Sequence, residues 1–229
     1  MRWRLLALVV AVLVVSNIVV NRFLPAVAYV PWNLGVAALV VVLARTELAW
    51  PDLGLDRSTV RRSLRWGAAG AAAVAVVYVI ALAVPATRSL FDDARAGDDG
   101  VRDLLYHALV QIPLGTVVLE EVAFRGVLPA VLGLRGVAGW RWPPVLAASL
   151  LFGLWHVLPS LDLAAANAGV QDAVGGSPVL TVTLAVLGTT IAGVFLCRWR
   201  WLGRGLLAPV LVHVATNSTG FTIAWFLAR

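Results

Sequence analysis

The sequence predicts an all-α protein: a polytopic transmembrane bundle of about seven to eight helices that forms a single domain, residues 1–229. Hydrophobic residues make up 61% of the chain, against roughly 45–50% in soluble proteins, and the mean hydropathy is +0.90. Long stretches such as 23–44, 66–87 and 205–228 contain no charged residue. A spanning helix needs about 20 apolar residues, which makes a soluble protein with buried helices the weaker interpretation.

Runs of apolar residues locate the helices. We expect them at about 5–24, 28–44, 66–85, 104–134, 143–158, 178–197 and 205–228. Pro129 and Gly133 interrupt the fourth, which suggests a span followed by a shorter re-entrant or interfacial piece. The first resembles a signal peptide because Arg2 and Arg4 precede it, but its apolar run continues to about Val20 and no small-residue cleavage pattern follows. We therefore expect an uncleaved first span.

The distribution of arginine predicts the orientation, since all 18 basic residues are arginines. With the N-terminus in the cytoplasm, most of them lie on the cytoplasmic side, as positive charge in loops favours: Arg2, Arg4, Arg45, Arg57, Arg61, Arg62, Arg65, Arg135, Arg141, Arg198, Arg200 and Arg204. The outer side receives Arg22, Arg88, Arg95, Arg102 and Arg229, together with the aspartate-rich loop 91–103. The prediction is a multi-pass protein of a cell membrane, and the Ala- and Val-rich, lysine-free composition favours a bacterial one.

Two basic segments, 53–65 and 198–204, mix arginine with apolar residues or tryptophan. Such segments anchor a protein against anionic lipid headgroups, so membrane lipid is an expected partner and nucleic acid is not. The single cysteine, Cys197, excludes an intrachain disulfide and a multi-cysteine metal site. Nothing in the sequence indicates an oligomeric state.

The most informative residues are Glu120 and Glu121, which lie within an apolar segment. Arg125 follows Glu121 by four residues. A charged side chain in hydrocarbon is costly and usually marks a functional site. Residues four apart share a helix face, so we expect Glu121 to pair with Arg125. Glu120 points elsewhere and is left to act as a general base. The alternative is that both carboxylates only hold helices together.

Two of the three histidines, His156 and His213, lie in later predicted spans, and Asn217 follows His213 by four residues. At 1.5 Å rise per residue, Glu120 lies ~21 Å, His156 ~20 Å and His213 ~12 Å from the inner end of its helix. These depths allow the three side chains to meet in one pocket. His213 and Asn217 share a face and supply donors suited to an oxyanion.

No serine, cysteine or threonine lies in a recognisable nucleophile motif, so water is the expected nucleophile, activated by a carboxylate, a metal or both. Glu120, His156 and His213 could hold Zn²⁺ with an open position for water, although the HExxH pattern is absent. Phe152, four residues before His156, places a ring beside the imidazole. His107 lies about 20 Å from Glu120 along its helix and is left out of the site.

Three motifs, EEVAFR (120–125), FGLWH (152–156) and HVATN (213–217), resemble those of the type II CAAX prenyl protease and bacteriocin-processing family of intramembrane proteases. The resemblance implies that Glu120 activates water with help from His156. It assigns the oxyanion to His213 and Asn217, and a supporting role to Glu121 and Arg125. Family members have been described both as metalloproteases and as metal-independent glutamate proteases, so Zn²⁺ remains open.

The resemblance also suggests a division into N-terminal helices, 1–103, and a catalytic half, 104–229. It predicts an endopeptidase that acts on membrane-embedded or lipid-linked peptides and proteins. A non-catalytic scaffold or bacteriocin-immunity protein of the same fold is the first alternative. A proton-coupled transporter is the second, but the inverted repeats typical of transporters are not visible in the sequence.

Overall fold

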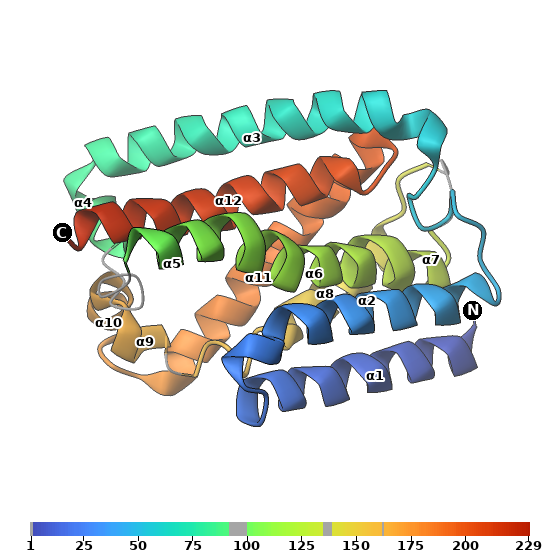
Figure 1. Ribbon diagram of the computed structural model, residues 1–229, viewed down its shortest axis with the longest axis horizontal. Helices are drawn as coiled ribbons and strands as arrows, with labels where there is room; N and C mark the ends of the chain where they lie inside the picture. The colour runs from blue at the N-terminus through green and yellow to red at the C-terminus, as the bar shows by residue number, and fades with distance from the viewer. Residues whose placement is uncertain (1, 92–99, 135–138, 162) are drawn as a thin grey trace.

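The computed structural model describes residues 2–91, 100–134, 139–161 and 163–229, and within these ranges it is an all-α bundle without a strand. Most of its long helices have their axes roughly aligned with the long axis of the bundle (Figure 1). The predicted fold class is therefore confirmed. Arg95, Arg135 and the loop aspartates at 92, 93, 98 and 99 lie outside the described residues.

The first two helices form an antiparallel hairpin. α1 (Trp3–Arg22) is joined to α2 (Tyr29–Arg45) through the short turn η1 (Ala26–Ala28). The Trp32 indole donates a hydrogen bond to the Ser16 hydroxyl at 3.0 Å, which fixes the two helices against each other near their connected end.

The next helix, α3 (Val60–Ala83), follows the short turn η2 (Arg57–Thr59) and packs along the last helix, α12 (Leu207–Leu227) (Figure 1). The Asp56 carboxylate accepts a hydrogen bond from the Ser58 amide at the start of η2, and this bond lowers the pKa of the carboxyl group below its usual range. A side chain at Gly67 would collide with α12, so glycine allows the close approach that packing in membranes favours.

A central helical column runs from residue 101 to residue 131 between α2 and α12 (Figure 1). It alternates between α and wider π geometry: α5 (Val101–Tyr106), η5 (His107–Val117), α6 (Val118–Glu121), η6 (Val122–Val127) and α7 (Leu128–Val131). Pro113, which cannot donate a backbone hydrogen bond, lies within the first π segment. The predicted break at Pro129 is wrong, because the column continues through this buried residue and ends near Gly133, which has φ +104°.

Two more helices complete the bundle, α8 (Trp142–Trp155) and α11 (Pro178–Gly203), and they pack against each other. Gly153 and Gly193 lie at this contact, where an added Cβ would meet Thr190 and Ser149 respectively. The predicted fifth helix, 143–158, is too long. α8 has 14 residues and ends at Trp155, so His156 lies just beyond it.

Short helices cover one end of the bundle, where the C-terminus also lies (Figure 1). They are α4 (Pro85–Arg88), η3 (Ser89–Phe91), α9 (Leu163–Ala166) and α10 (Ala168–Val174). The Asn167 side chain donates to the Leu90 carbonyl at 3.0 Å, joining the two loops that contain these helices.

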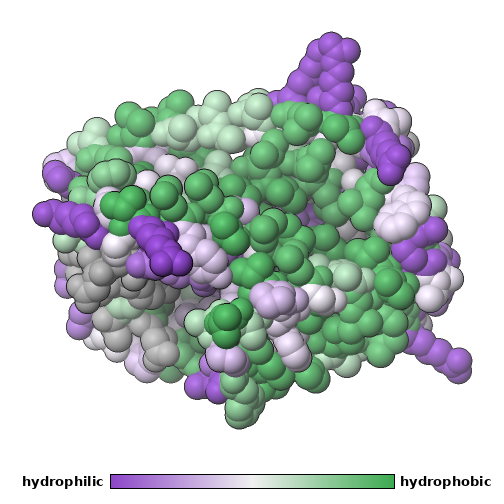
Figure 2. Space-filling view, in the orientation of Figure 1, coloured by the Kyte–Doolittle hydropathy of each residue, from purple (hydrophilic) through white to green (hydrophobic). Residues whose placement is uncertain are grey.

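The surface matches a membrane environment. Among the described residues, five helical segments are long and apolar enough to cross a bilayer: 3–22, 26–45, 57–83, 178–203 and 207–227. The central column and α8 add two further helical pieces to these. Figure 2 shows an apolar surface over the middle of the molecule and hydrophilic residues concentrated toward its two ends. The protein is a membrane helix bundle.

Candidate active site

Both glutamates lie in α6, the single turn of α-helix between the two π segments of the central column. Glu120 is 5% exposed and Glu121 is fully buried. π segments are rare and occur frequently at functional sites. Because the wider turns change which way successive side chains point, they set the direction in which both carboxylates leave the column.

Glu121 belongs to a buried cluster of charged groups. Its Oε1 lies 3.2 Å from Nη1 of Arg125 and 2.7 Å from Nδ1 of His213 on α12. The Arg125 guanidinium lies over the Phe152 ring, 3.9 Å from the centroid, a favourable arrangement for a cation and an aromatic face. The structure thus brings Glu121 and Arg125 together as their four-residue spacing predicts. We call Glu121, Arg125 and His213 the ion cluster.

Phe152 packs against this cluster with its aromatic ring. Its ring packs edge-on against His156 at 4.6 Å and His213 at 6.1 Å between centroids. Phe124 lies on another side at 5.2 Å. Phe152 is 2% exposed and does not line the cavity described below. The structure therefore places this predicted site residue among packing contacts.

Glu120 has different surroundings. Its Oε1 accepts a hydrogen bond from the Trp155 indole at 3.0 Å, while its buried Oε2 has no hydrogen-bond partner among the described residues. Oε2 lies 3.6 Å from Nε2 of His213. The adjacent glutamates thus approach the two nitrogens of one imidazole, a convergence that their divergence on a helix did not predict.

The imidazole of His213 is held by a defined set of hydrogen bonds. A carboxylate can only accept, so Nδ1 donates to Glu121, and in the neutral ring Nε2 then accepts the Nδ2–H of Asn217 at 3.1 Å. The four-residue spacing of His213 and Asn217 therefore produces a direct contact. An amide NH₂ has two hydrogens, which leaves the second Asn217 N–H for the cavity that this residue also lines.

His156 caps the end of α8. Its Nδ1 is 2.8 Å from the Phe152 carbonyl oxygen, which only accepts, so Nδ1 carries the proton. Nε2 of the neutral ring is then a free acceptor, and His156 lines the same cavity as Glu120 and Asn217. No direct contact joins His156 to Glu120.

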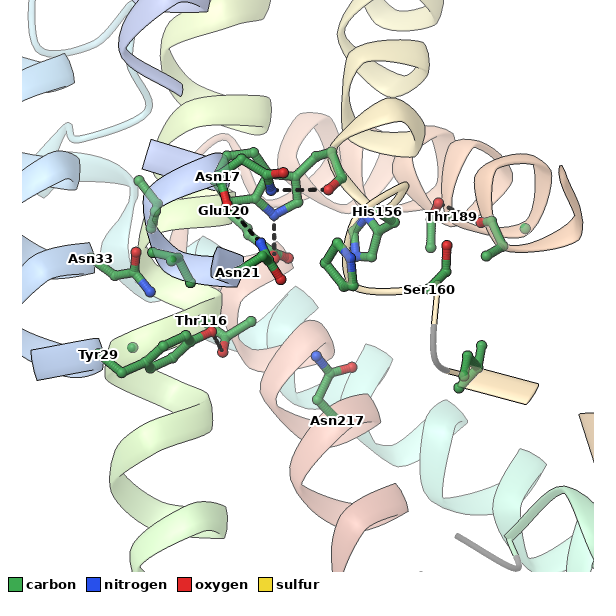
Figure 3. Close-up of a pocket in the computed structure, with 18 of the residues that line it drawn as sticks. Asn17, Asn21, Tyr29, Asn33, Thr116, Glu120, His156, Ser160, Thr189 and Asn217 are labelled. Atoms are coloured by element: carbon green, nitrogen blue, oxygen red, sulfur yellow. Dashed lines mark hydrogen bonds between the residues drawn. The ribbon is translucent and has the colours of Figure 1, made fainter. Parts of the chain in front are cut away.

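A polar cavity of about 620 Å³ lies at this point of the bundle. Figure 3 shows Glu120, His156 and Asn217 on its wall, together with polar residues from the first two helices. Asn17, Asn21, Tyr29 and Asn33 supply these additional groups. The Tyr29 hydroxyl is hydrogen-bonded to Thr116 of the central column at 2.9 Å.

The depths estimated from the sequence predict that Glu120, His156 and His213 meet in one pocket. Glu120 and His213 do meet, with Oε2 and Nε2 3.6 Å apart. His213 lies deeper than its position in the sequence indicates, because the turn between α11 and α12 is drawn into the bundle. In this turn the Leu206 amide donates to the Gly54 carbonyl at 3.0 Å, and Leu206 is 5% exposed. His107 packs against Phe221 at 5.2 Å and does not line the cavity.

The predicted zinc ligands do not form a compact set. Within the described residues, no group of three His, Cys, Asp or Glu side chains has an arrangement that could hold a metal ion. Both nitrogens of His213 already face protein groups: Glu121 on one side, and Asn217 and Glu120 on the other. As arranged here, Glu120, His156 and His213 do not form the Zn²⁺ ligand set that the sequence left open.

Several residues of the site were not predicted from the sequence, among them Trp155, Asn17 and Asn33. Trp155 is the fourth residue of the FGLWH motif, directly before His156, and an aromatic residue among apolar ones gives no signal of a polar role. The asparagines did give one, because an amide in an otherwise apolar span needs a partner.

The protein is thus a membrane-type helix bundle that brings carboxylate, imidazole and amide groups together at a polar cavity. Comparison with known families then identifies the group: residues 102–219, just over half of the chain, match the family described as type II CAAX prenyl endopeptidase Rce1-like, and the protein belongs to it. The matched segment contains Glu120, His156 and Asn217. Neither a curated protein nor a solved structure matches the chain.

Proposed function

We propose that the protein is an intramembrane endopeptidase that hydrolyses a peptide bond with water activated by Glu120. The observation that supports this most is the buried Glu120 carboxylate at a polar cavity, whose Oε2 has no hydrogen-bond partner among the described residues, in a chain of the Rce1-like family. A carboxylate oxygen without a hydrogen bond is costly in the free protein, and a water molecule donating to it removes that cost.

The catalytic water binds between Glu120 and His156. It donates one hydrogen to Oε2 of Glu120 and the other to Nε2 of His156, neither of which has a hydrogen-bond partner among the described residues. As water attacks the scissile carbonyl carbon, Glu120 takes its proton and later delivers it to the leaving amine. General acid–base catalysis of this kind contributes about 10²–10⁴-fold.

Asn217 stabilises the tetrahedral oxyanion. One of its N–H groups is bound to His213, which orients the amide, and the other points to the cavity. This assignment refines what the resemblance implies: in the neutral tautomer, Nε2 of His213 accepts and does not donate. His213 therefore acts by orienting Asn217, and the ion cluster fixes His213 in turn.

The substrates are membrane-embedded or lipid-linked peptides, which reach the cavity within a multi-pass protein whose N-terminus faces the cytoplasm. The ends of the bundle support this orientation. Arg2, Arg45 and Arg204 lie at the helix ends on one side, and the opposite end, with Arg22 and Arg88, has fewer arginines in its loops.

The alternative is a non-catalytic scaffold of the same fold that uses the cavity to bind a partner. A cavity of about 620 Å³ lined by amides and hydroxyls supports binding as well as catalysis. The two proposals differ in one respect: only hydrolysis needs a proton acceptor at Glu120.

A direct test measures cleavage of an apolar peptide library by the purified protein in lipid nanodiscs. We expect the wild type to release new amino termini and Glu120→Gln to lower the rate by at least about 100-fold. Glu47→Gln is the matched control, since this exposed acid lies at the bundle end and should retain full activity. A chelator added to each reaction reports whether a metal participates.

Equal rates for the wild type and Glu120→Gln would overturn the assignment of Glu120. Absence of cleavage by a folded wild type over a broad library would favour the scaffold. Loss of activity with the chelator would show that a metal binds in an arrangement other than the one described.

A further inference from the structure

Two helices that precede the family-matched segment, α1 and α3, are each joined to that segment by a side-chain hydrogen bond. Asn17 of α1 donates to the Trp155 carbonyl at 3.1 Å, and both residues line the catalytic cavity. In the first turn of α3, Nε of Arg62 donates to the Leu202 carbonyl near the end of α11 at 2.7 Å. Arg62 does not line the catalytic cavity, so its surroundings need a separate explanation.

A pocket of about 440 Å³ lies beside Arg62 at the start of α3. We call it the basic pocket, and it is lined by Ser58, Arg61, Arg62, Arg65 and Trp66. Positions 58, 61, 62 and 65 follow the three- and four-residue steps of a single helix face, and all four residues are exposed. Because another face of α3 packs against α12, the arginines are directed away from the bundle.

The charges of the basic pocket are not neutralised by the protein. Among the described residues, Arg61 and Arg65 have neither an ion-pair partner nor a hydrogen-bond partner, and Arg62 uses only its Nε. The nearest acid in the sequence, Asp56, accepts a hydrogen bond from the Ser58 amide at 2.8 Å and does not line the pocket. Three guanidinium groups on one face create a positive potential that favours an anion.

The basic pocket lies at the level of the lipid headgroups. Segment 57–83, which contains η2 and α3, has 27 residues and as a helix is about 40 Å long, against ~30 Å for the hydrocarbon core. All its charged residues precede Trp66. The Trp66 ring lies 6.2 Å from that of Trp199, and tryptophan concentrates at the membrane interface. Figure 2 shows hydrophilic atoms projecting where α3 begins (Figure 1).

We propose that the basic pocket binds the phosphate group of one anionic phospholipid, held mainly by Arg61 and Arg65. This goes beyond a general attraction of segment 53–65 to anionic headgroups, because a guanidinium group binds phosphate through two parallel N–H donors in a defined geometry. A lipid fits better than a free phosphate ion, since Trp66 lines the pocket and the adjacent Leu64 is 45% exposed. These apolar groups lie where acyl chains would continue along α3.

A lipid bound in the basic pocket should stabilise the whole bundle, because the start of α3 is tied to the turn between α11 and α12. Besides the Arg62 contact, the Ser63 hydroxyl donates to the Gly205 carbonyl at 3.0 Å and accepts from the Ala208 amide at 2.8 Å. A ligand that binds only the folded protein raises its unfolding temperature. Phosphatidylglycerol added to phosphatidylcholine nanodiscs should therefore raise the unfolding temperature of the wild type.

The test titrates purified protein in detergent with phosphatidylglycerol and counts bound lipids by native mass spectrometry. Arg61→Gln combined with Arg65→Gln should weaken binding by about 25-fold, since each arginine near a membrane surface contributes about 5-fold. Arg61→Lys combined with Arg65→Lys keeps the charge but loses the paired donors, so we expect a loss of about 5-fold.

The control variant combines Arg4→Gln with Arg204→Gln, which removes the same charge from exposed residues at the same end of the bundle but outside the pocket. It should affect binding far less than the Arg61 and Arg65 variants. Diacylglycerol, which lacks the phosphate, should not bind. Inorganic phosphate at the same concentration should not displace the lipid.

Wild-type affinity in the lysine variant would overturn the inference, because diffuse charge would then explain the binding. Displacement by inorganic phosphate would overturn it in favour of a free-anion site. Equal unfolding temperatures with and without phosphatidylglycerol would show that no lipid stabilises the bundle there, and would overturn it as well. These measurements do not depend on peptide cleavage, so the inference stands or falls separately from the proposed hydrolysis.

Discussion

Glu120 and Glu121 are neighbours in the chain but lie in two different environments. Glu121 has the Arg125 guanidinium and the His213 imidazole on the same carboxylate oxygen. Glu120 accepts an indole N–H on one oxygen, and its other oxygen, 3.6 Å from Nε2 of His213, has no hydrogen-bond partner among the described residues. The ion cluster balances charge within the protein, whereas the cavity wall leaves acceptors open. The difference shows how one buried acid can stabilise a fold while the next one remains available for chemistry.

The largest expected effect comes from breaking the charge balance of the ion cluster. Arg125→Met removes the arginine that pairs with Glu121 and leaves a buried carboxylate without that counter-charge. Breaking a buried ion pair on one side costs about 3–5 kcal/mol. We expect a correspondingly large loss of stability, measured by thermal unfolding in detergent.

The matched control for this change is the double variant Glu121→Gln with Arg125→Met. The glutamine oxygen still accepts from His213, and the ion cluster then contains no unpaired buried charge. Unfolding at a higher temperature than Arg125→Met alone is the expected result. A double variant no more stable than the single one would show that Arg125 acts mainly through its contact with Phe152.

The next effect tests the cavity wall at Asn217. Asn217→Ala removes the donor aimed at the oxyanion, and the loss of one such donor typically lowers kcat by about 10²–10³-fold. Stability should change much less than with Arg125→Met, because the amide is only partly buried. Turnover and unfolding are measured on the same preparation.

Thr222→Val serves as the control for Asn217→Ala, since the Thr222 hydroxyl bonds only within α12, to the Ser218 carbonyl. A similar fall in kcat for both variants would indicate that α12 is generally disturbed. The proposed role of Asn217 would then lose its support.

The smallest effect concerns the link between Trp155 and Glu120. Trp155→Phe keeps the ring against Phe124 but removes the indole N–H that orients Glu120. Because one hydrogen bond to a charged group is lost, we expect kcat/KM to fall by about 10-fold. Trp140→Phe, a ring contact near the start of α8, should leave kcat/KM unchanged. Equal rates for Trp155→Phe and the wild type would mean that Glu120 is oriented by other contacts.

Sequence patterns predicted the parts of this site that depend on position along one helix. The four-residue steps from Glu121 to Arg125 and from His213 to Asn217 both appear as contacts, because helical periodicity alone decides them. Apolar runs likewise located the long helices to within a few residues in most cases. The divergence of adjacent residues also separated the environments of the two glutamates.

The features that escaped prediction depend on how helices meet. The convergence of both glutamates on His213 requires the π segments of the central column, and Pro113 signals only a disturbance there, not its geometry. The early end of α8 moves His156 from a helix face to a cap. The depth of His213 follows from the contact between Leu206 and Gly54, residues far apart in the sequence. None of these is encoded in a local pattern.

The contact between Asn17 and Trp155 has a consequence for the evolution of the chain. It joins α1, which lies outside the family-matched segment, to the residue that holds Glu120. A substitution at position 17 that loses the amide releases the end of α8, and only a compensating change near position 155 restores the contact. Among homologues that keep this arrangement, the two positions should therefore covary. Exchanging the first helix between such proteins should succeed only when the segment around position 155 is exchanged with it.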